Sequence, residues 1–259
     1  MKKEELKNKA LKLSKDKIVF YLVESGSRLW GFESKDSDYD LRGFFVYKRN
    51  KEFSLKKADY FEYLNKSEKF DLVLFHVDKA FNLLSKSNPS VIEWLMAKEE
   101  DIYFDKFNLR EWFNNEIKDF INLRALFCHY FNLARDNWQK YFVNNNKLTY
   151  KKTLYILRGL LNAKYILEKN ELPPIKFLEL IKIGDYKEKI EKIIEIKKKG
   201  KENMVFNDKE LLNYIKNLFD ELKDKGKEIN YEKEKEQRLF KKVNKKVVEI
   251  KDILLCQNF

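Results

Sequence analysis

Two short groups of residues have the types and the spacing that chemistry needs. Gly26 and Ser27 form a Gly-Ser pair, and further along the chain Asp38 and Asp40 are separated by one residue. Because side chains alternate across a strand, both carboxylates would point to one face of an extended segment. Paired carboxylates suit Mg²⁺, which prefers oxygen ligands and keeps water or phosphate as its other partners. The Gly-Ser pair suits the phosphate, since glycine allows close backbone approach and the serine hydroxyl can donate to phosphate oxygens.

Other sites that use similar residues do not fit this chain. A calcium-binding EF-hand loop that began at Asp36 would need glycine at Leu41 and glutamate at Tyr47. The sequence also contains no Walker A loop and no G-x-S-x-G nucleophile motif. With only two histidines in the chain, a histidine-rich metal site is excluded. Of the kinds of site considered, a magnesium site built on carboxylates is the one that remains.

The composition indicates a folded, mainly helical protein. Of the 259 residues, 44% are hydrophobic, 37% are charged, and only 7 are Gly and 3 are Pro, which favours long helices over turn-rich β architectures. Cys128 and Cys256 stand apart, so neither a disulfide framework nor a zinc site is predicted. No apolar run approaches the roughly 20 residues of a membrane span. We therefore expect a cytoplasmic protein with no membrane partner.

The hydrophobic pattern changes along the chain. After an N-terminal helix, apolar runs predict four strands and a short fifth one, at residues 18–23, 39–47, 60–64, 70–77 and 102–104. The later residues show helical periods at 109–121, 123–142, 149–169, 174–183, 186–199, 208–225 and 231–255. The pattern predicts an α+β domain over residues 1–105 and a helical domain over residues 106–259.

The charge is divided unequally between these two expected domains. The chain has a net charge of +12, of which residues 1–105 carry +1 and residues 106–259 carry +11. A basic domain is the expected footprint of a phosphate-bearing partner such as RNA, although a lysine-rich composition can also be only a solvated surface.

The block GSRLWGFESKDSDYDLRGFFV resembles the polymerase-beta nucleotidyltransferase superfamily, in which a Gly-Ser motif precedes a strand with an Asp-x-Asp pair. More narrowly, this block and the later segment Asn88-Pro89-Ser90-Val91-Ile92-Glu93-Trp94-Leu95 resemble a bacterial and phage group of nucleotidyltransferases linked to RNA repair. The resemblance spans about residues 20 to 180. It implies a palm-like mixed sheet with three carboxylates, followed by a helical domain that helps to hold nucleotide and acceptor.

The resemblance also implies a catalytic set. Asp38 and Asp40 match the motif directly, and they would hold two Mg²⁺ ions, with Mn²⁺ as the alternative metal. The third carboxylate has no fixed spacing; we select Asp71, at the start of an apolar strand, and keep Glu62 on the preceding strand as the alternative. The residues predicted to bind the nucleotide are Gly26, Ser27, Arg28, Arg42, Lys152, Tyr155 and Arg158. Arg28 and Arg42 could instead neutralise the carboxylates.

The resulting hypothesis is an enzyme that transfers a nucleoside monophosphate from an NTP such as ATP to an acceptor hydroxyl and releases pyrophosphate. The preferred acceptor is an RNA end, with tRNA as a candidate, in RNA repair or processing. One alternative is nucleotidylation of a protein or a small molecule, as in antitoxin-like or antibiotic-modifying relatives. The other is a non-catalytic RNA-binding module.

Overall fold

The computed structural model describes residues 2–144 and 147–256, which pack as two units. Of these, the sheet unit comprises residues 2–29, 38–121 and 233–256, and the helical unit comprises residues 30–37, 122–144 and 147–232. The chain therefore passes from the sheet unit to the helical unit and back twice.

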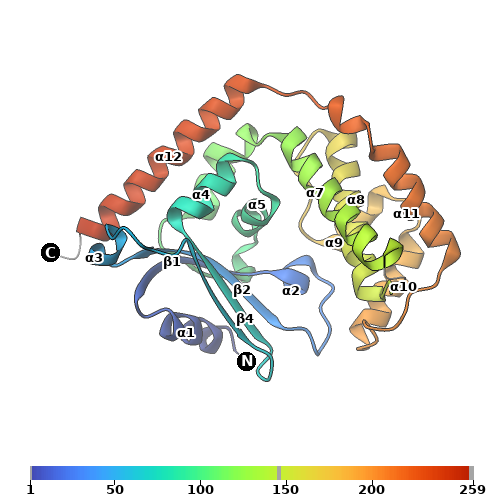
Figure 1. The fold of residues 1–259 in the computed structure, drawn as a ribbon, viewed down its shortest axis with the longest axis horizontal. Coiled ribbons are helices and arrows are strands. Elements are labelled where there is room, and N and C mark those ends of the chain that lie inside the picture. Colours follow the sequence, from blue (N-terminus) through green and yellow to red (C-terminus); the bar gives the residue numbers. More distant parts are fainter. Residues whose placement is uncertain (1, 145–146, 257–259) are drawn as a thin grey trace. The chain divides into compact units, whose positions relative to one another are not determined.

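A mixed five-stranded sheet forms the centre of the sheet unit (Figure 1). Its strands are β1 (Lys17–Glu24), β2 (Tyr39–Tyr47), β3 (Tyr60–Asn65), β4 (Phe70–His76) and β5 (Ile102–Asp105). Their order across the sheet is β3-β4-β2-β1-β5, and β2 and β4 are parallel whereas the other neighbours are antiparallel. The five strands predicted from the apolar runs are confirmed.

Helices cover both faces of this sheet (Figure 1). On one face, α1 (Lys3–Leu13) packs Leu6 and Ala10 into a buried cluster with strand residues such as Phe45. On the other face, α4 (Val77–Ser85) and α5 (Pro89–Met96) bring Phe81 and Trp94 within ring-stacking distance of Phe44. Because neighbouring residues of β2 alternate between these faces, Asp40 and Arg42 belong to the same face as Phe44.

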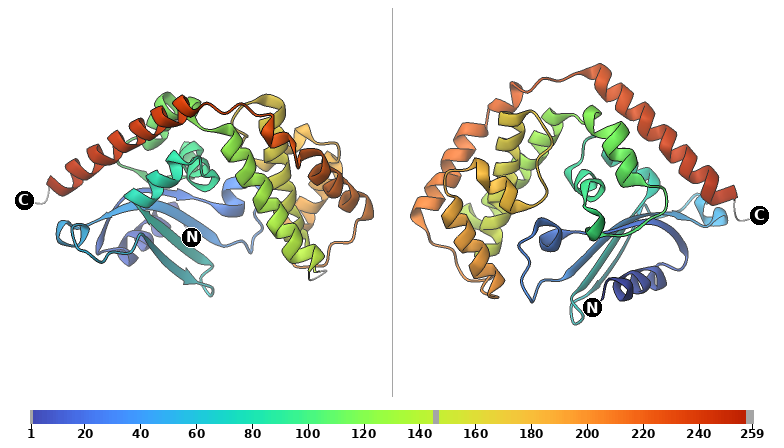
Figure 2. Two further views of the ribbon diagram at one scale, coloured as in Figure 1. Left: turned by 45° about the horizontal axis from the view of Figure 1, so that its top comes forward. Right: turned by 180° about the vertical axis from the view of Figure 1, so that it is seen from behind.

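The C-terminal helix α12 (Lys233–Cys256) belongs to the sheet unit and packs along α4, as the views in Figure 2 also show. It buries an apolar stripe that includes Leu239, Val243, Ile250 and Leu254. The remaining α-helices of this unit are α2 (Gly26–Trp30), whose last residue belongs to the helical unit, α3 (Arg49–Glu52) and α6 (Leu109–Trp112). Residues 106–121 and α12, which we expected in the second domain, thus pack with the sheet.

The helical unit consists of α7 (Leu123–Trp138), α8 (Tyr150–Lys169), α9 (Phe177–Leu180), α10 (Lys187–Lys198) and α11 (Lys209–Leu222). Helices α7 and α8 cross closely at Gly159, where an added Cβ would lie 2.8 Å from the Cβ of Ala134. The expected start of a helix at residue 174 is wrong, because α9 begins only at Phe177. Proline at residue 174 disfavours helical backbone at Pro173, and a bend at residues 175–176 precedes the helix.

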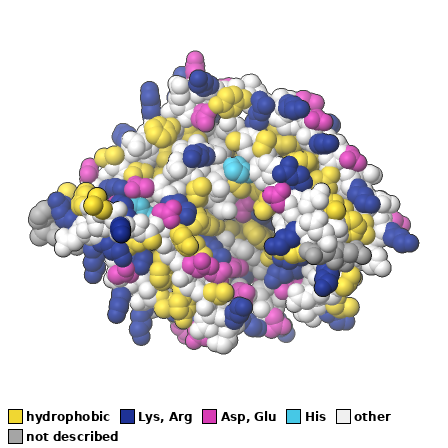
Figure 3. Space-filling model, in the orientation of Figure 1, with side chains coloured by type: hydrophobic (Ala, Val, Ile, Leu, Met, Phe, Trp, Pro, Cys, Tyr) yellow, Lys and Arg dark blue, Asp and Glu magenta, His cyan; other side chains and the backbone are white. Residues whose placement is uncertain are grey.

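The observed packing also changes the distribution of charge. The helical unit has 24 Lys and Arg against 18 Asp and Glu, and the rest of the chain has 30 against 24, so that each carries +6. Lys and Arg side chains are accordingly scattered over the face in Figure 3. The contrast of +1 and +11 came mainly from placing the basic helix α12 in the second domain.

Candidate active site

The Gly-Ser turn lies directly against Asp40. Gly26 begins α2 with a φ of 61°, and the backbone N–H of Ser25 donates to the carbonyl oxygen of Asp40 at 2.7 Å. A Cβ on residue 26 would lie 2.1 Å from Asp40 Oδ2, so only glycine fits here. The indole Nε1 of Trp94 donates to Ser25 Oγ at 3.1 Å, which ties helix α5 to the turn. Ser27 follows as a buried residue of α2.

The strand register brings two carboxylates together. Asp40 on β2 and Asp71 on β4 are direct partners in the parallel ladder, so both belong to one face of the sheet. Asp38 comes immediately before β2 and is exposed. Glu62 belongs to the same face but lies on the edge strand β3, opposite Val73, with β4 between it and β2. The structure therefore favours Asp71 over Glu62 as the carboxylate next to Asp40.

Arg42 connects the two carboxylates. Its Nη2 lies 2.9 Å from Asp71 Oδ2 and 3.4 Å from Asp40 Oδ1, while its Nη1 donates to the carbonyl oxygen of Asp71 at 3.1 Å. The other carboxylate oxygen, Asp71 Oδ1, is buried and has no hydrogen-bond partner among the described residues. A buried carboxylate oxygen without a donor is a suitable cation ligand, so Asp40 and Asp71 fit a divalent metal ion.

Arg28 has a different set of contacts. Its Nε donates to the backbone carbonyl of Asp38 at 3.0 Å, and its guanidinium lies 4.1 Å from the ring centroid of Tyr39. Both arginines therefore hold the backbone around the acidic residues, and Arg42 also contacts the carboxylates of Asp40 and Asp71.

The sequence interpretation missed Glu24 and Tyr103. Glu24 ends β1 next to Ser25; its Oε1 accepts from the backbone N–H of Asp40 at 3.2 Å, and its Oε2 accepts from the Tyr103 hydroxyl at 2.6 Å. Burial raises the pKa of Glu24 from 4.5 to about 7, against the lowering effect of the Tyr103 hydrogen bond. The available signal was a charged residue at the end of an otherwise apolar strand.

Glu24 predicts a specific pH dependence of stability. Its pKa is raised in the folded state, so the folded state keeps the proton between about pH 4.5 and 7 while the unfolded state loses it. Stability should therefore fall by about 3 kcal/mol as pH rises through this window. Chemical unfolding of wild type and Glu24→Gln across pH 4 to 8 measures this, and we expect the variant to lack that decline. Parallel stability curves for the two proteins would contradict the assignment.

The three remaining nucleotide-binding candidates belong to the helical unit, on α8. Arg158 is buried, with its guanidinium 3.9 Å from the ring centroid of Trp30. Tyr155 also packs edge-on against Trp30, with ring centroids 5.7 Å apart. Lys152 has its ammonium 4.3 Å from the ring centroid of Tyr141. Tyr155 and Arg158 therefore hold the segment 30–37, which joins the Gly-Ser turn to Asp38 in the chain.

A buried lysine secures the same segment. Lys197 is 1% exposed; its Nζ lies 3.1 Å from Glu202 Oε2 and donates to Ser37 Oγ at 3.3 Å. Glu202 also pairs with Lys151 at 2.9 Å, so Lys151 is part of this internal network. Burial lowers the pKa of Lys197, although Glu202 opposes that shift.

A second group of potential metal ligands contains Glu52, His76 and Asp78. His76 Nε2 lies 2.8 Å from Glu52, while Lys251 of α12 lies 3.2 Å from Glu52 and 2.7 Å from Asp78. Burial alone would raise the pKa of Glu52, but hydrogen bonds from His76 and Lys57 outweigh it and lower the pKa to about 2. Lysine and histidine nitrogens occupy both carboxylate oxygens of Glu52 and both of Asp78, so neither residue has an oxygen left for a metal ion. The cluster is therefore an ion-pair network that fastens α12 to the sheet unit.

The α+β architecture, with an acidic pair on a mixed sheet and a glycine turn against it, is polymerase-beta-like. The chain belongs to the RNA repair pathway DNA polymerase beta family (RlaP), whose model matches residues 2–246. It is also 32% identical over 188 residues to a Bacillus subtilis (strain 168) protein named "Uncharacterized protein YcgL", with 71% of each chain covered. This membership confirms the family resemblance and supports a role of the nucleotidyltransferase type.

None of the helices in the described part of the chain has the length and apolar character needed to cross a membrane.

Proposed function

We propose that this protein transfers a nucleoside monophosphate from an NTP to an acceptor hydroxyl at an RNA end. The observation that carries the proposal is the direct pairing of Asp40 with Asp71 beside a turn that only glycine fits. A carboxylate pair and a Gly-Ser turn beside it are the two halves of a site for a metal-bound triphosphate.

The residues of the chain have separate tasks in this reaction. Asp38 and Asp40 would hold the divalent ions, Asp71 would complete the ligand set through its unpaired Oδ1, and Ser27 would donate to phosphate oxygens. Mg²⁺, or Mn²⁺ in its place, lowers the pKa of the attacking hydroxyl and neutralises charge on the leaving pyrophosphate when bound.

The chemistry is a single phosphoryl substitution. The acceptor oxygen forms a bond to the α-phosphorus, the bond from the α-phosphorus to the bridging oxygen of the β-phosphate breaks, and the hydroxyl proton passes to Asp71 or to water. Arg42 keeps Asp71 in position through Oδ2 and leaves Oδ1 for the metal.

The family description supports RNA as the acceptor. The helical unit and the rest of the chain each carry +6, so net charge does not indicate that the helical unit rather than the sheet unit binds a polyanion. The acceptor therefore has to be identified by what becomes labelled.

The experiment incubates the purified protein with each α-³²P-labelled NTP, magnesium, and either total cellular RNA or RNase-treated lysate. Label in RNA that is removed by RNase and absent with Asp40→Asn is the expected result. Label found only in protein or in a small molecule would replace RNA by the other acceptor classes. No label in any fraction, with Mg²⁺ or with Mn²⁺, would count against an active transferase.

A further inference from the structure

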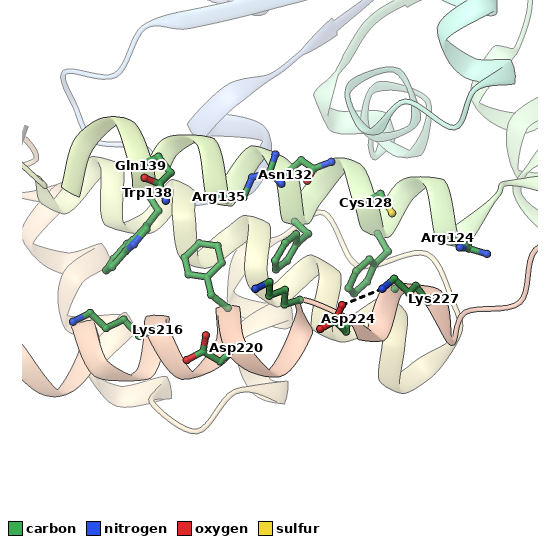
Figure 4. Close-up of a pocket in the computed structure, with 15 residues that line it drawn as sticks. Arg124, Cys128, Asn132, Arg135, Trp138, Gln139, Lys216, Asp220, Asp224 and Lys227 are labelled. Atoms are coloured by element: carbon green, nitrogen blue, oxygen red, sulfur yellow. Dashed lines mark hydrogen bonds and ion pairs between the residues drawn. The ribbon is translucent and has the colours of Figure 1, made fainter. Parts of the chain in front are cut away.

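The helical unit contains a cavity of about 810 Å³, and none of its lining residues belongs to the candidate active site. It lies between α7 and the segment formed by α11 and the short 3-10 turn Lys225–Lys227 (Figure 4). Along α7 its lining runs from Arg124 to Gln139, which is roughly 22 Å at 1.5 Å per residue. Such a long cavity suits a short polymer better than a single small molecule.

Aromatic rings form much of the cavity wall. Phe127 and Phe131 lie nearly parallel, with an interplanar angle of 4° and ring centroids 6.2 Å apart. Phe219 of α11 packs against Phe131 at 5.8 Å and against Trp138 at 5.7 Å. Phe131 and Phe219 are only half-buried, so part of each ring is available to a ligand. Partly exposed aromatic rings are the stacking surfaces on which single-stranded nucleic acids place their bases.

Cations surround these rings. Five Lys or Arg residues line the cavity against two aspartates, and Lys227 pairs with one of these, Asp224, at 3.2 Å. Arg124, Lys216 and Lys223 make no ion pair with any described residue. In Figure 4, Lys216 and Arg124 lie toward opposite ends of the cavity. The cavity therefore offers positive charge along its length, as a phosphate backbone requires.

We propose that this cavity binds a short single-stranded segment of RNA, with bases against Phe131 and Phe219 and phosphates at Lys216, Lys223 and Arg124. The aromatic wall and the cationic rim match the two parts of a nucleotide chain. An acidic polypeptide would pair with the cations of the rim but would place no bases against the aromatic wall. The choice of RNA rests on the proposed function, but binding is measured without NTP or turnover, so the two can fail separately.

The first test measures binding of a labelled oligouridylate of about eight nucleotides across a salt series. Lys216→Gln/Lys223→Gln removes two phosphate contacts, so the slope of log affinity against log salt should decrease by about 1.4. The matched control is Lys192→Gln/Lys209→Gln, which removes two exposed lysines of the same unit outside the cavity. Equal slopes for the two double variants would overturn the proposal.

The second test separates base stacking from charge. Phe219→Leu keeps an apolar side chain in the wall but removes the flat ring, so affinity should decrease about tenfold with an unchanged salt slope. Polyglutamate of matched charge should compete poorly with the oligonucleotide. An unchanged affinity of Phe219→Leu together with effective competition by polyglutamate would identify an acidic polypeptide as the partner instead.

The third test locates the bound strand. Cys128 is exposed and lines the cavity, and Cys256 is an exposed cysteine of the other unit. In a Cys256→Ser background, oligouridylate should slow alkylation of Cys128, and it should not do so in the Lys216→Gln/Lys223→Gln variant. Binding without any protection of Cys128 in the parent protein would place the RNA elsewhere.

Discussion

Asp40→Asn should lower nucleotidyl transfer by about a thousandfold or more while the fold remains intact. Asp40 is half-buried, pairs in the ladder with Asp71, and lies where a Cβ on Gly26 would collide with it. The amide of asparagine keeps the shape of the side chain but removes the negative charge that holds a divalent ion. Asp38→Asn should have a comparable effect, because the exposed Asp38 carboxylate is the other acid of the Asp-x-Asp motif.

The control for both variants is Asp36→Asn, which changes an exposed acid in the same stretch of chain. Initial rates with saturating NTP and magnesium, together with thermal unfolding of each variant, separate loss of chemistry from loss of structure. Full activity in a folded Asp40→Asn protein would remove the paired carboxylates from the mechanism.

Asp71→Asn is expected to behave like Asp40→Asn, whereas Glu62→Gln should leave turnover within about twofold of wild type. Both acids belong to the same face of the sheet, and each substitution replaces one carboxylate by an amide. The two variants therefore differ only in the position of the lost charge. They differ in their distance from β2, because Asp71 is on the adjacent strand and Glu62 is one strand further away. Asp71 also has the buried oxygen without a partner.

The measurement is the steady-state rate of each variant at several magnesium concentrations. A weakened metal site should give Asp71→Asn a higher magnesium requirement as well as a lower maximal rate. If Glu62→Gln is the inactive variant and Asp71→Asn the active one, Glu62 is the third carboxylate.

The strands and most of the helices can be predicted from the sequence, because each is indicated by a pattern within a short stretch of chain. Apolar runs between polar turns predict the five strands, and periods of 3.6 residues predict α7, α8, α10 and α11 to within a few residues. Which of these elements pack against one another cannot be predicted from such short stretches. Helix α12 is visible as a helix, but its return to the sheet unit depends on contacts with α4 and on the pairing of Lys251 with Asp78.

The candidate active site likewise combines residues that a short motif identifies with residues whose roles depend on the fold. The Gly-Ser pair and the Asp-x-Asp pair are readable because both lie in one short block of sequence. Asp71 could be selected only by the character of its strand, since the parallel pairing of β2 with β4 is a long-range choice. The roles of Arg42 and Glu24 depend on which atoms they meet after folding, so residue type alone could not assign them.

The position of the label that is transferred tests the central claim most directly. The acceptor identified with α-labelled NTP is incubated with magnesium and either α-³²P-labelled or γ-³²P-labelled NTP. Attack at the α-phosphorus predicts that only the α-label enters the acceptor, that the γ-label appears in pyrophosphate, and that Asp40→Asn abolishes both signals. Transfer of the γ-label to the acceptor, or unchanged transfer by Asp40→Asn, would contradict a nucleotidyltransferase built on these carboxylates.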